Sequence, residues 1–125
     1  MIKWLENNRI ASLIITILIA AEIFYFSTLT GRTSIETGSN MLPIIYHFVV
    51  FFLFSFFVLI TIKGKNNIQI KYVLVTIVIS VLYAFSDEFH QIFVPGRNAN
   101  MNDILIDGAG ILFSIIINFI NYKKD

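Results

Sequence analysis

The residues best suited to chemistry gather in one stretch, Ser86–Arg97, which reads SDEFHQIFVPGR. Asp87, His90 and Gln91 are spaced i, i+3 and i+4, so on a helix they share one face. A proline-glycine turn follows and is expected to aim the Arg97 guanidinium back toward the end of that helix. Carboxylates and histidine can exchange protons, and a guanidinium binds anions such as phosphate. The stretch therefore predicts a shared binding or catalytic site.

Ten residues make up the candidate site. Those that we expect to take part in proton transfer are Asp87, Glu88, His90 and Asp103. Those that we expect to bind a substrate are Glu22, Arg32, His47, Gln91, Arg97 and Asp107. In this scheme Glu88, or the neighbouring His90, would serve as general base or acid. The two arginines would hold an anionic group.

Four apolar runs must position these residues: Ile10–Phe26, Ile44–Ile62, Ile68–Phe85 and Ile104–Ile120. With its flanking residues, each approaches the roughly 20 residues that a helix needs to cross the ~30 Å hydrocarbon layer. The chain is 57% hydrophobic and only 14% charged, which a soluble domain of 125 residues could not bury. The sequence therefore predicts an all-α polytopic membrane protein with four transmembrane helices, and residues 1–125 as one domain.

The charges predict which way the helices lie in the membrane. Seven cations fall at the two termini and in the loop between the second and third runs, against two in the other loops. Because cytoplasmic loops carry the excess of Lys and Arg, we expect both termini to be cytoplasmic in a multi-pass protein of the cell membrane. Six of the eight acids and both histidines then lie toward the extracytoplasmic side. Any chemical function should belong to that half.

Isolated charges inside a membrane are costly and are usually paired or functional. We therefore expect Glu22 to pair with His47, and Asp107 to pair with Arg97 or Arg32. Asp103 has a simpler reading as a favourable acid in the first turn of the last helix. The glycines that follow Asp107 are expected to let two helices approach closely.

Composition also excludes some classes of function. A net charge of +1 provides no general attraction for nucleic acid, and the absence of cysteine removes thiolate catalysis and Cys-ligated metal sites. We expect no cofactor. Histidines 47 and 90 with nearby carboxylates are ligand types that suit zinc or manganese, but they lack the spacing of a compact two-histidine helix motif, and no metal ligand is assigned.

Three sequence elements resemble the VanZ-like family of small polytopic membrane proteins. They are Phe26-Ser27-Thr28 after the first helix, His47-Phe48 at the start of the second, and the series SDEFHQIFVPGRNANMNDILIDGAG. By position, the family's acid, glutamine, arginine and aspartate fall on Glu88, Gln91, Arg97 and Asp103.

Two departures from the family pattern stand out. Ile44-Ile45-Tyr46 replaces a basic residue that often precedes the helix-two histidine, and Asp107 stands where the family often has Asn. The family is named for a protein that gives resistance to teicoplanin, a lipoglycopeptide antibiotic that acts at the cell envelope. The resemblance thus implies a place in the envelope rather than a particular reaction.

Two functional hypotheses follow. In the first, the outer polar site binds or modifies an envelope lipid or a lipid-linked head group, and contributes to glycopeptide resistance. No established nucleophile motif is present, so catalysis stays open. In the alternative, the protein is a small proton-coupled transporter that uses Glu22. Four helices with one carboxylate in the first helix resemble the small multidrug-resistance transporters, which work as dimers. A homo-oligomer is compatible with either hypothesis.

Topology can be tested by cysteine labelling, because the chain has no cysteine of its own. We expect a membrane-impermeant maleimide to label Ser39→Cys in intact cells, and to label Asn66→Cys only after permeabilisation. Labelling of Asn66→Cys from outside would reverse the orientation.

Overall fold

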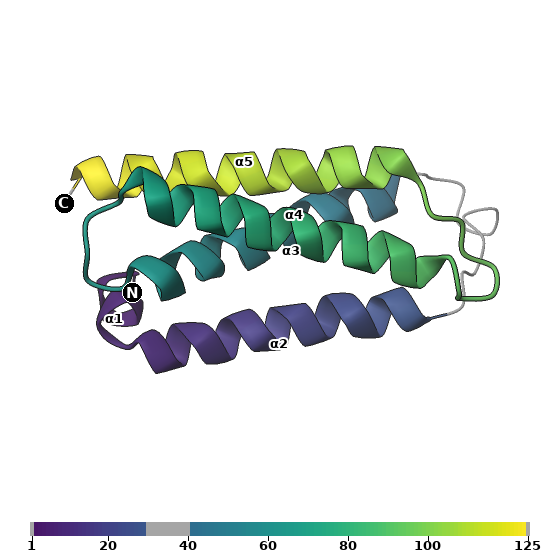
Figure 1. Cartoon of the computed structure of the whole chain (residues 1–125), viewed down its shortest axis with the longest axis horizontal. Helices are drawn as coiled ribbons and strands as arrows, with labels where there is room; N and C mark the ends of the chain where they lie inside the picture. Colours follow the sequence, from purple (N-terminus) through teal and green to yellow (C-terminus); the bar gives the residue numbers. More distant parts are fainter. Residues whose placement is uncertain (1, 30–40, 125) are drawn as a thin grey trace.

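The computed structural model describes residues 2–29 and 41–124, with side chains up to residue 122, and its elements are all α-helices (Figure 1). They are α1 (Ile2–Asn7), α2 (Arg9–Thr28), α3 (Met41–Lys63), α4 (Ile70–Gln91) and α5 (Met101–Lys124). Four helices are long and apolar enough to cross a membrane: α2, α3, α4 and the Met101–Tyr122 part of α5. This confirms the predicted all-α fold with four spans. The short α1 was not predicted.

The four long helices form an antiparallel bundle, with successive helices running in opposite directions (Figure 1). Both chain ends and the α3–α4 connection lie at one end of the bundle, which we call the terminal end. The end of α2, the start of α3 and the α4–α5 connection lie at the other end, which we call the distal end. Helices α3 and α4 each pack against the other three long helices, and α3 also contacts α1.

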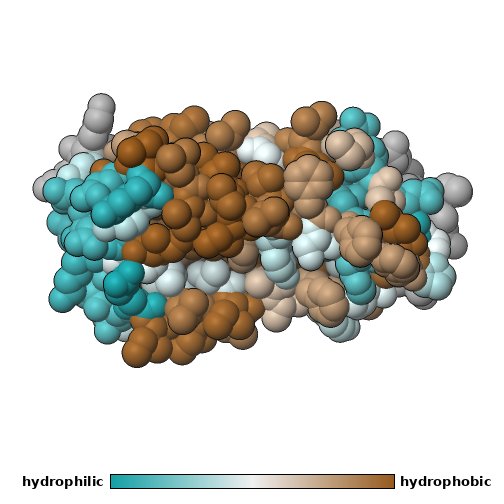
Figure 2. Space-filling view, in the orientation of Figure 1, coloured by the Kyte–Doolittle hydropathy of each residue, from teal (hydrophilic) through white to brown (hydrophobic). Residues whose placement is uncertain are grey.

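The bundle has an interior in which apolar side chains such as Phe51 and Ile60 are buried together with polar ones, and an apolar exterior. Buried positions are occupied by small hydroxyl residues on all four long helices, including Ser12, Ser55, Thr76, Ser80 and Ser114. Large apolar side chains such as Leu18, Leu82 and Leu112 are exposed instead. In Figure 2 hydrophobic surface fills most of the middle of the face shown, and hydrophilic surface gathers toward the two ends. This is the distribution expected where lipid replaces water around the middle of the bundle.

Helices α3 and α5 approach each other closely at Gly110. A Cβ placed on this glycine would lie 2.5 Å from the Phe48 carbonyl oxygen and 3.0 Å from the Phe52 nitrogen. A Cβ on Gly108, by contrast, would meet nothing within 4 Å. The expected packing role is therefore confirmed for Gly110 and wrong for Gly108. Nearby, the Ser114 hydroxyl donates to the Ser55 hydroxyl at 2.9 Å and joins the same two helices.

These two glycines give a matched pair of substitutions. Gly110→Ala should lower the free energy of unfolding in detergent by about 1–3 kcal/mol, because the methyl group forces the α3 backbone away. Gly108→Ala should be neutral or slightly stabilising, since Ala is the better helix former and the space is open. Denaturant unfolding of both variants measures the difference, and equal stability would contradict the tight α3–α5 contact.

Candidate functional site

Five polar residues are buried together near the distal end of the bundle. We call them the polar cluster: His47, Asp87, Glu88, Gln91 and Asp107. They come from the start of α3, the last turn of α4 and the second turn of α5. None is more than 7% exposed. Burial of three carboxylates in an apolar bundle is costly, so the arrangement demands a specific reason.

Helix α4 brings its acids into the bundle by regular periodicity. Its buried residues are Val73, Thr76, Ser80, Ala84, Asp87, Glu88 and Gln91. Most follow the 3.6-residue repeat of one helix face, so the acids continue the stripe that small residues occupy in the earlier turns. The helix runs through the charged stretch and ends at Gln91, where the Gln91 amide donates to Asp87 Oδ2 at 3.0 Å.

The strongest link across helices in the cluster joins His47 and Asp107. Their Nδ1 and Oδ1 atoms lie 2.9 Å apart, and the Asp107 residue is fully buried. Among the described residues, His47 thus pairs with Asp107 rather than with Glu22, and Asp107 pairs with His47 rather than with Arg97. The bond corrects the expected Glu22–His47 pair and the expected Asp107–Arg97 pair, while the other expected partner of Asp107, Arg32, lies outside the described residues. It ties α3 to α5 and fixes the orientation of the imidazole ring.

Glu88 is held from outside its own helix. Its Oε2 accepts a hydrogen bond of 2.9 Å from the backbone N–H of Asn100, in the connection before α5. Within the described part of the chain, Glu88 Oε1 and Asp107 Oδ2 are buried and accept no hydrogen bond. A buried carboxylate oxygen without a donor is costly. The cluster therefore has the capacity to accept further hydrogen bonds or to bind a cation.

Arg97 borders the polar cluster and binds the end of α2. Its Nη2 donates to the Phe26 carbonyl at 2.8 Å and its Nε to the Leu29 carbonyl at 3.2 Å. A cation at the C-terminus of a helix also interacts favourably with the helix dipole. These bonds occupy only part of the five guanidinium donors, so Arg97 fastens α2 and can still bind an anion.

The other predicted residues lie around the cluster or away from it. Glu22 is exposed on α2, and Asp103 is half-buried in the first turn of α5. His90 is half-buried, with its ring centroid 4.7 Å from that of Phe24. Arg32 lies outside the described residues. The structure thus brings together five of the ten candidate residues, with Arg97 at their border.

Sequence reasoning missed two contributors to this region. The Asn100 backbone N–H holds Glu88, and no side-chain pattern reveals such a contact. Ser27 is only 3% exposed and lies beside Asp87. The Phe26-Ser27-Thr28 element contains Ser27 and could have pointed to it, but in the sequence alone this element is only a feature shared with the family.

Three residues of the cluster have the chemistry to hold a metal ion. His47, Glu88 and Asp107 each offer one ligand atom, and these atoms lie within 4.8 Å of one another. The sequence had suggested His47 with His90. In the structure Glu88 and Asp107 join His47 instead, and His90 does not belong to this group.

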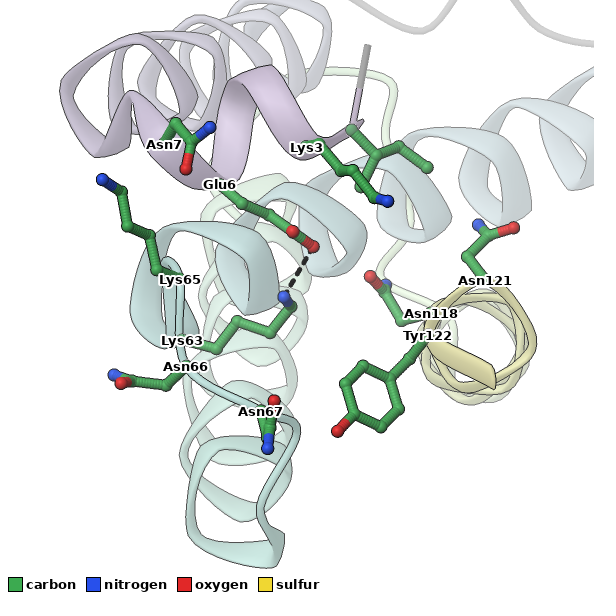
Figure 3. A pocket seen from close by; sticks show the side chains of 11 residues that line it. Lys3, Glu6, Asn7, Lys63, Lys65, Asn66, Asn67, Asn118, Asn121 and Tyr122 are labelled. Atoms are coloured by element: carbon green, nitrogen blue, oxygen red, sulfur yellow. Dashed lines mark hydrogen bonds and ion pairs between the residues drawn. The ribbon is translucent and has the colours of Figure 1, made fainter. Parts of the chain in front are cut away.

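A second polar region lies at the terminal end (Figure 3). Here a cavity of about 290 Å³ is lined by residues of α1, the α3–α4 connection and the end of α5. Lys63 is buried beside it and donates to Glu6 Oε1 at 2.6 Å. Arg9 donates to the carbonyls of Thr61 and Ile62 at the end of α3. None of the nine candidate residues that the structure describes lines this cavity.

The family model described as VanZ/LLP1 matches residues 9–121. The chain belongs to the VanZ/LLP1 family. The match covers almost all of the four long helices and the whole polar cluster, and leaves α1 outside. No curated protein and no solved structure matches the chain. As a VanZ/LLP1 protein with four apolar helices, it is a multi-pass membrane protein.

The His47–Asp107 bond predicts energetic coupling between α3 and α5. His47→Ala and Asp107→Ala should each destabilise the protein, because each leaves a buried polar partner unsatisfied. The double variant should be less destabilised than the sum of the two by about 0.5–3 kcal/mol. Unfolding in detergent with a chelator present measures this coupling, and strictly additive effects would exclude a bond that matters for stability.

Proposed function

We propose that this VanZ/LLP1 protein binds or modifies the head group of an envelope lipid or of a lipid-linked envelope precursor at its polar cluster. The observation that carries the proposal is a set of buried carboxylates with two oxygens that accept no hydrogen bond within the described residues. Helix packing alone would be served by smaller polar side chains, as it is elsewhere in the bundle. The surplus of acceptors favours a ligand that brings its own donors.

The chemistry of the cluster favours a head group with both hydroxyl or ammonium groups and a phosphate. Glu88 and Asp107 offer acceptors for the former. Arg97, at the border of the cluster, offers donors for the latter. Phosphate-linked sugars and amines combine these features. The orienting bond between His47 and Asp107 would leave the second ring nitrogen of the imidazole for proton transfer, should the head group be modified.

The surroundings of the cluster suit the apolar part of such a ligand. Phe89 and Phe93 are 63% and 70% exposed near the end of α4, and Leu105 on α5 is 72% exposed. A lipid lying against these side chains could keep its acyl chains in the bilayer while its head group reaches the polar cluster. The excess of cations at the terminal end supports an extracytoplasmic location for the cluster.

Resistance to glycopeptides of the teicoplanin type is the broader role that we propose. The family resemblance suggests it, and a protein that handles an envelope head group could change what such an antibiotic meets at the cell surface.

Proton-coupled transport through Glu22 is the competing proposal. Glu22 is exposed on an apolar helix, where an unshared carboxylate in lipid is costly. A second copy of the chain packed on this face would shield it, which supports a homo-oligomer in that case. The two proposals therefore depend on different acids, one inside the bundle and one on its surface.

Mass spectrometry of lipids bound to the purified protein tests the first proposal. After incubation with lipids from the host envelope, wild-type protein should retain or alter one lipid class. Glu88→Gln should reduce this at least about tenfold, because a hydrogen bond to a charged group contributes ~1.5–3 kcal/mol and 1.4 kcal/mol is tenfold.

Glu22→Gln makes the same chemical change outside the cluster and should leave lipid handling intact. Arg97→Lys keeps a cation beside the α2 carbonyls and tests the anion contact with the least disturbance of the helix. Absence of any retained or altered lipid in the wild type would contradict the head-group proposal. Loss of activity only in Glu22→Gln would favour transport.

A further inference from the structure

We propose that His47, Glu88 and Asp107 form a binding site for one divalent transition-metal ion, with zinc and manganese as the best matches. The site goes beyond the head-group proposal and does not depend on it. The three ligands come from α3, α4 and α5, so an ion bound here would join three of the four long helices.

The distances fit a shared ion. All three ligand atoms lie within 4.8 Å of one another, whereas neighbouring ligands on one tetrahedral zinc ion are about 3.4 Å apart at bond lengths of ~2.1 Å. His47 Nδ1 and Asp107 Oδ1 lie 2.9 Å apart in a direct hydrogen bond, which is slightly shorter than that spacing, so an ion coordinated by both atoms would replace the hydrogen bond and move them apart by a few tenths of an ångström. A small movement of the Glu88 side chain toward this pair would complete the set.

The local charges favour a cation. Two buried carboxylates share the site, and within the described ranges no lysine or arginine forms an ion pair with either of them. Arg97 donates instead to the carbonyls at the end of α2. A divalent ion would balance both negative charges in a region where water is scarce.

Two oxygens of the site, Glu88 Oε1 and Asp107 Oδ2, accept no hydrogen bond among the described residues, although their residues are 4% and 0% exposed. This observation is independent of the clustering and indicates a ligand for the carboxylates. The other Glu88 oxygen accepts from the Asn100 N–H at 2.9 Å. Such a bond from the surrounding chain is typical of metal-binding carboxylates, whose orientation it fixes.

The ligand types narrow the choice of ion. Imidazole with carboxylate oxygens suits zinc and manganese better than calcium or magnesium, which prefer oxygen alone. Three protein ligands would also leave at least one coordination position for an outside group. That arrangement is characteristic of catalytic zinc sites and differs from closed structural ones.

Metal content and metal binding provide the test. Protein purified without chelator should contain close to one equivalent of zinc or manganese by plasma mass spectrometry. After chelator treatment and its removal, titration with ZnCl₂ and MnCl₂ should give one site by calorimetry and should raise the melting temperature of the wild type by several degrees.

Variants assign the ligands. His47→Gln, Glu88→Gln and Asp107→Asn should each weaken binding of the preferred ion at least tenfold, since even loss of an outer partner of a ligand costs 10–100-fold (roughly) in affinity. Glu22→Gln, the matched control for Glu88→Gln, should bind as the wild type does. If a ligand variant does not fold, the wild-type stoichiometry and melting shift still decide the question.

Two results would overturn the inference: a wild type that neither contains nor binds either ion, and one-site binding that none of the three substitutions weakens. Lipid retention measured in chelator separates this inference from the head-group proposal. Lipid retention without any metal binding would support the head-group proposal and contradict the metal site. Metal binding without any lipid retention would support the metal site and contradict the head-group proposal.

Discussion

The close approach of α3 and α5 at Gly110 is the constraint on which the rest of the structure depends. Gly110 faces the backbone at Phe48, the residue directly after His47, and it lies three residues beyond Asp107 on α5. Since the backbones come so near each other here, a short aspartate side chain reaches the imidazole across the interface at 2.9 Å. A larger residue at position 110 would separate the helices and, with them, the two partners. Helix packing and site geometry are thus set by one small residue.

The bundle uses polar side chains in two different ways. Over most of its length, hydroxyl groups such as Ser55 and Ser114 bond to each other or to nearby carbonyls, and they join helices without introducing charge. Near the distal end, the buried face of α4 carries Asp87 and Glu88 in place of the small residues of its earlier turns. Lipid offers no hydrophobic drive to hold helices together, so hydroxyl contacts suffice for packing. The buried carboxylates differ from these neutral hydroxyl contacts because packing alone does not require them. This difference distinguishes the polar cluster from the rest of the interior.

The four spans and the gathering of acids and histidines in one half of the bundle could be predicted, because both follow from hydropathy and spacing along the chain. The residues that pair with one another could not be predicted, because the pairing depends on how each helix is rotated about its axis. A helix turns about 100° per residue. On α4 the buried arc runs from Asp87 through Gln91 to Glu88, whereas His90 lies about 60° to the other side and packs on Phe24. Glu22 likewise falls on the outer face of α2, a choice that only packing decides.

The ion pair at the terminal end has a consequence for the order of assembly during synthesis. Glu6 of α1 binds Lys63, which follows it by 57 residues at the end of α3. The contact between α1 and α3 can therefore form only after α3 has been synthesised. Until then the Glu6 carboxylate does not have Lys63 as its partner, whereas the contacts of α1 with α2 need no later part of the chain. The wall that α1 contributes to the terminal cavity is thus complete only once the second long helix is present to hold Glu6.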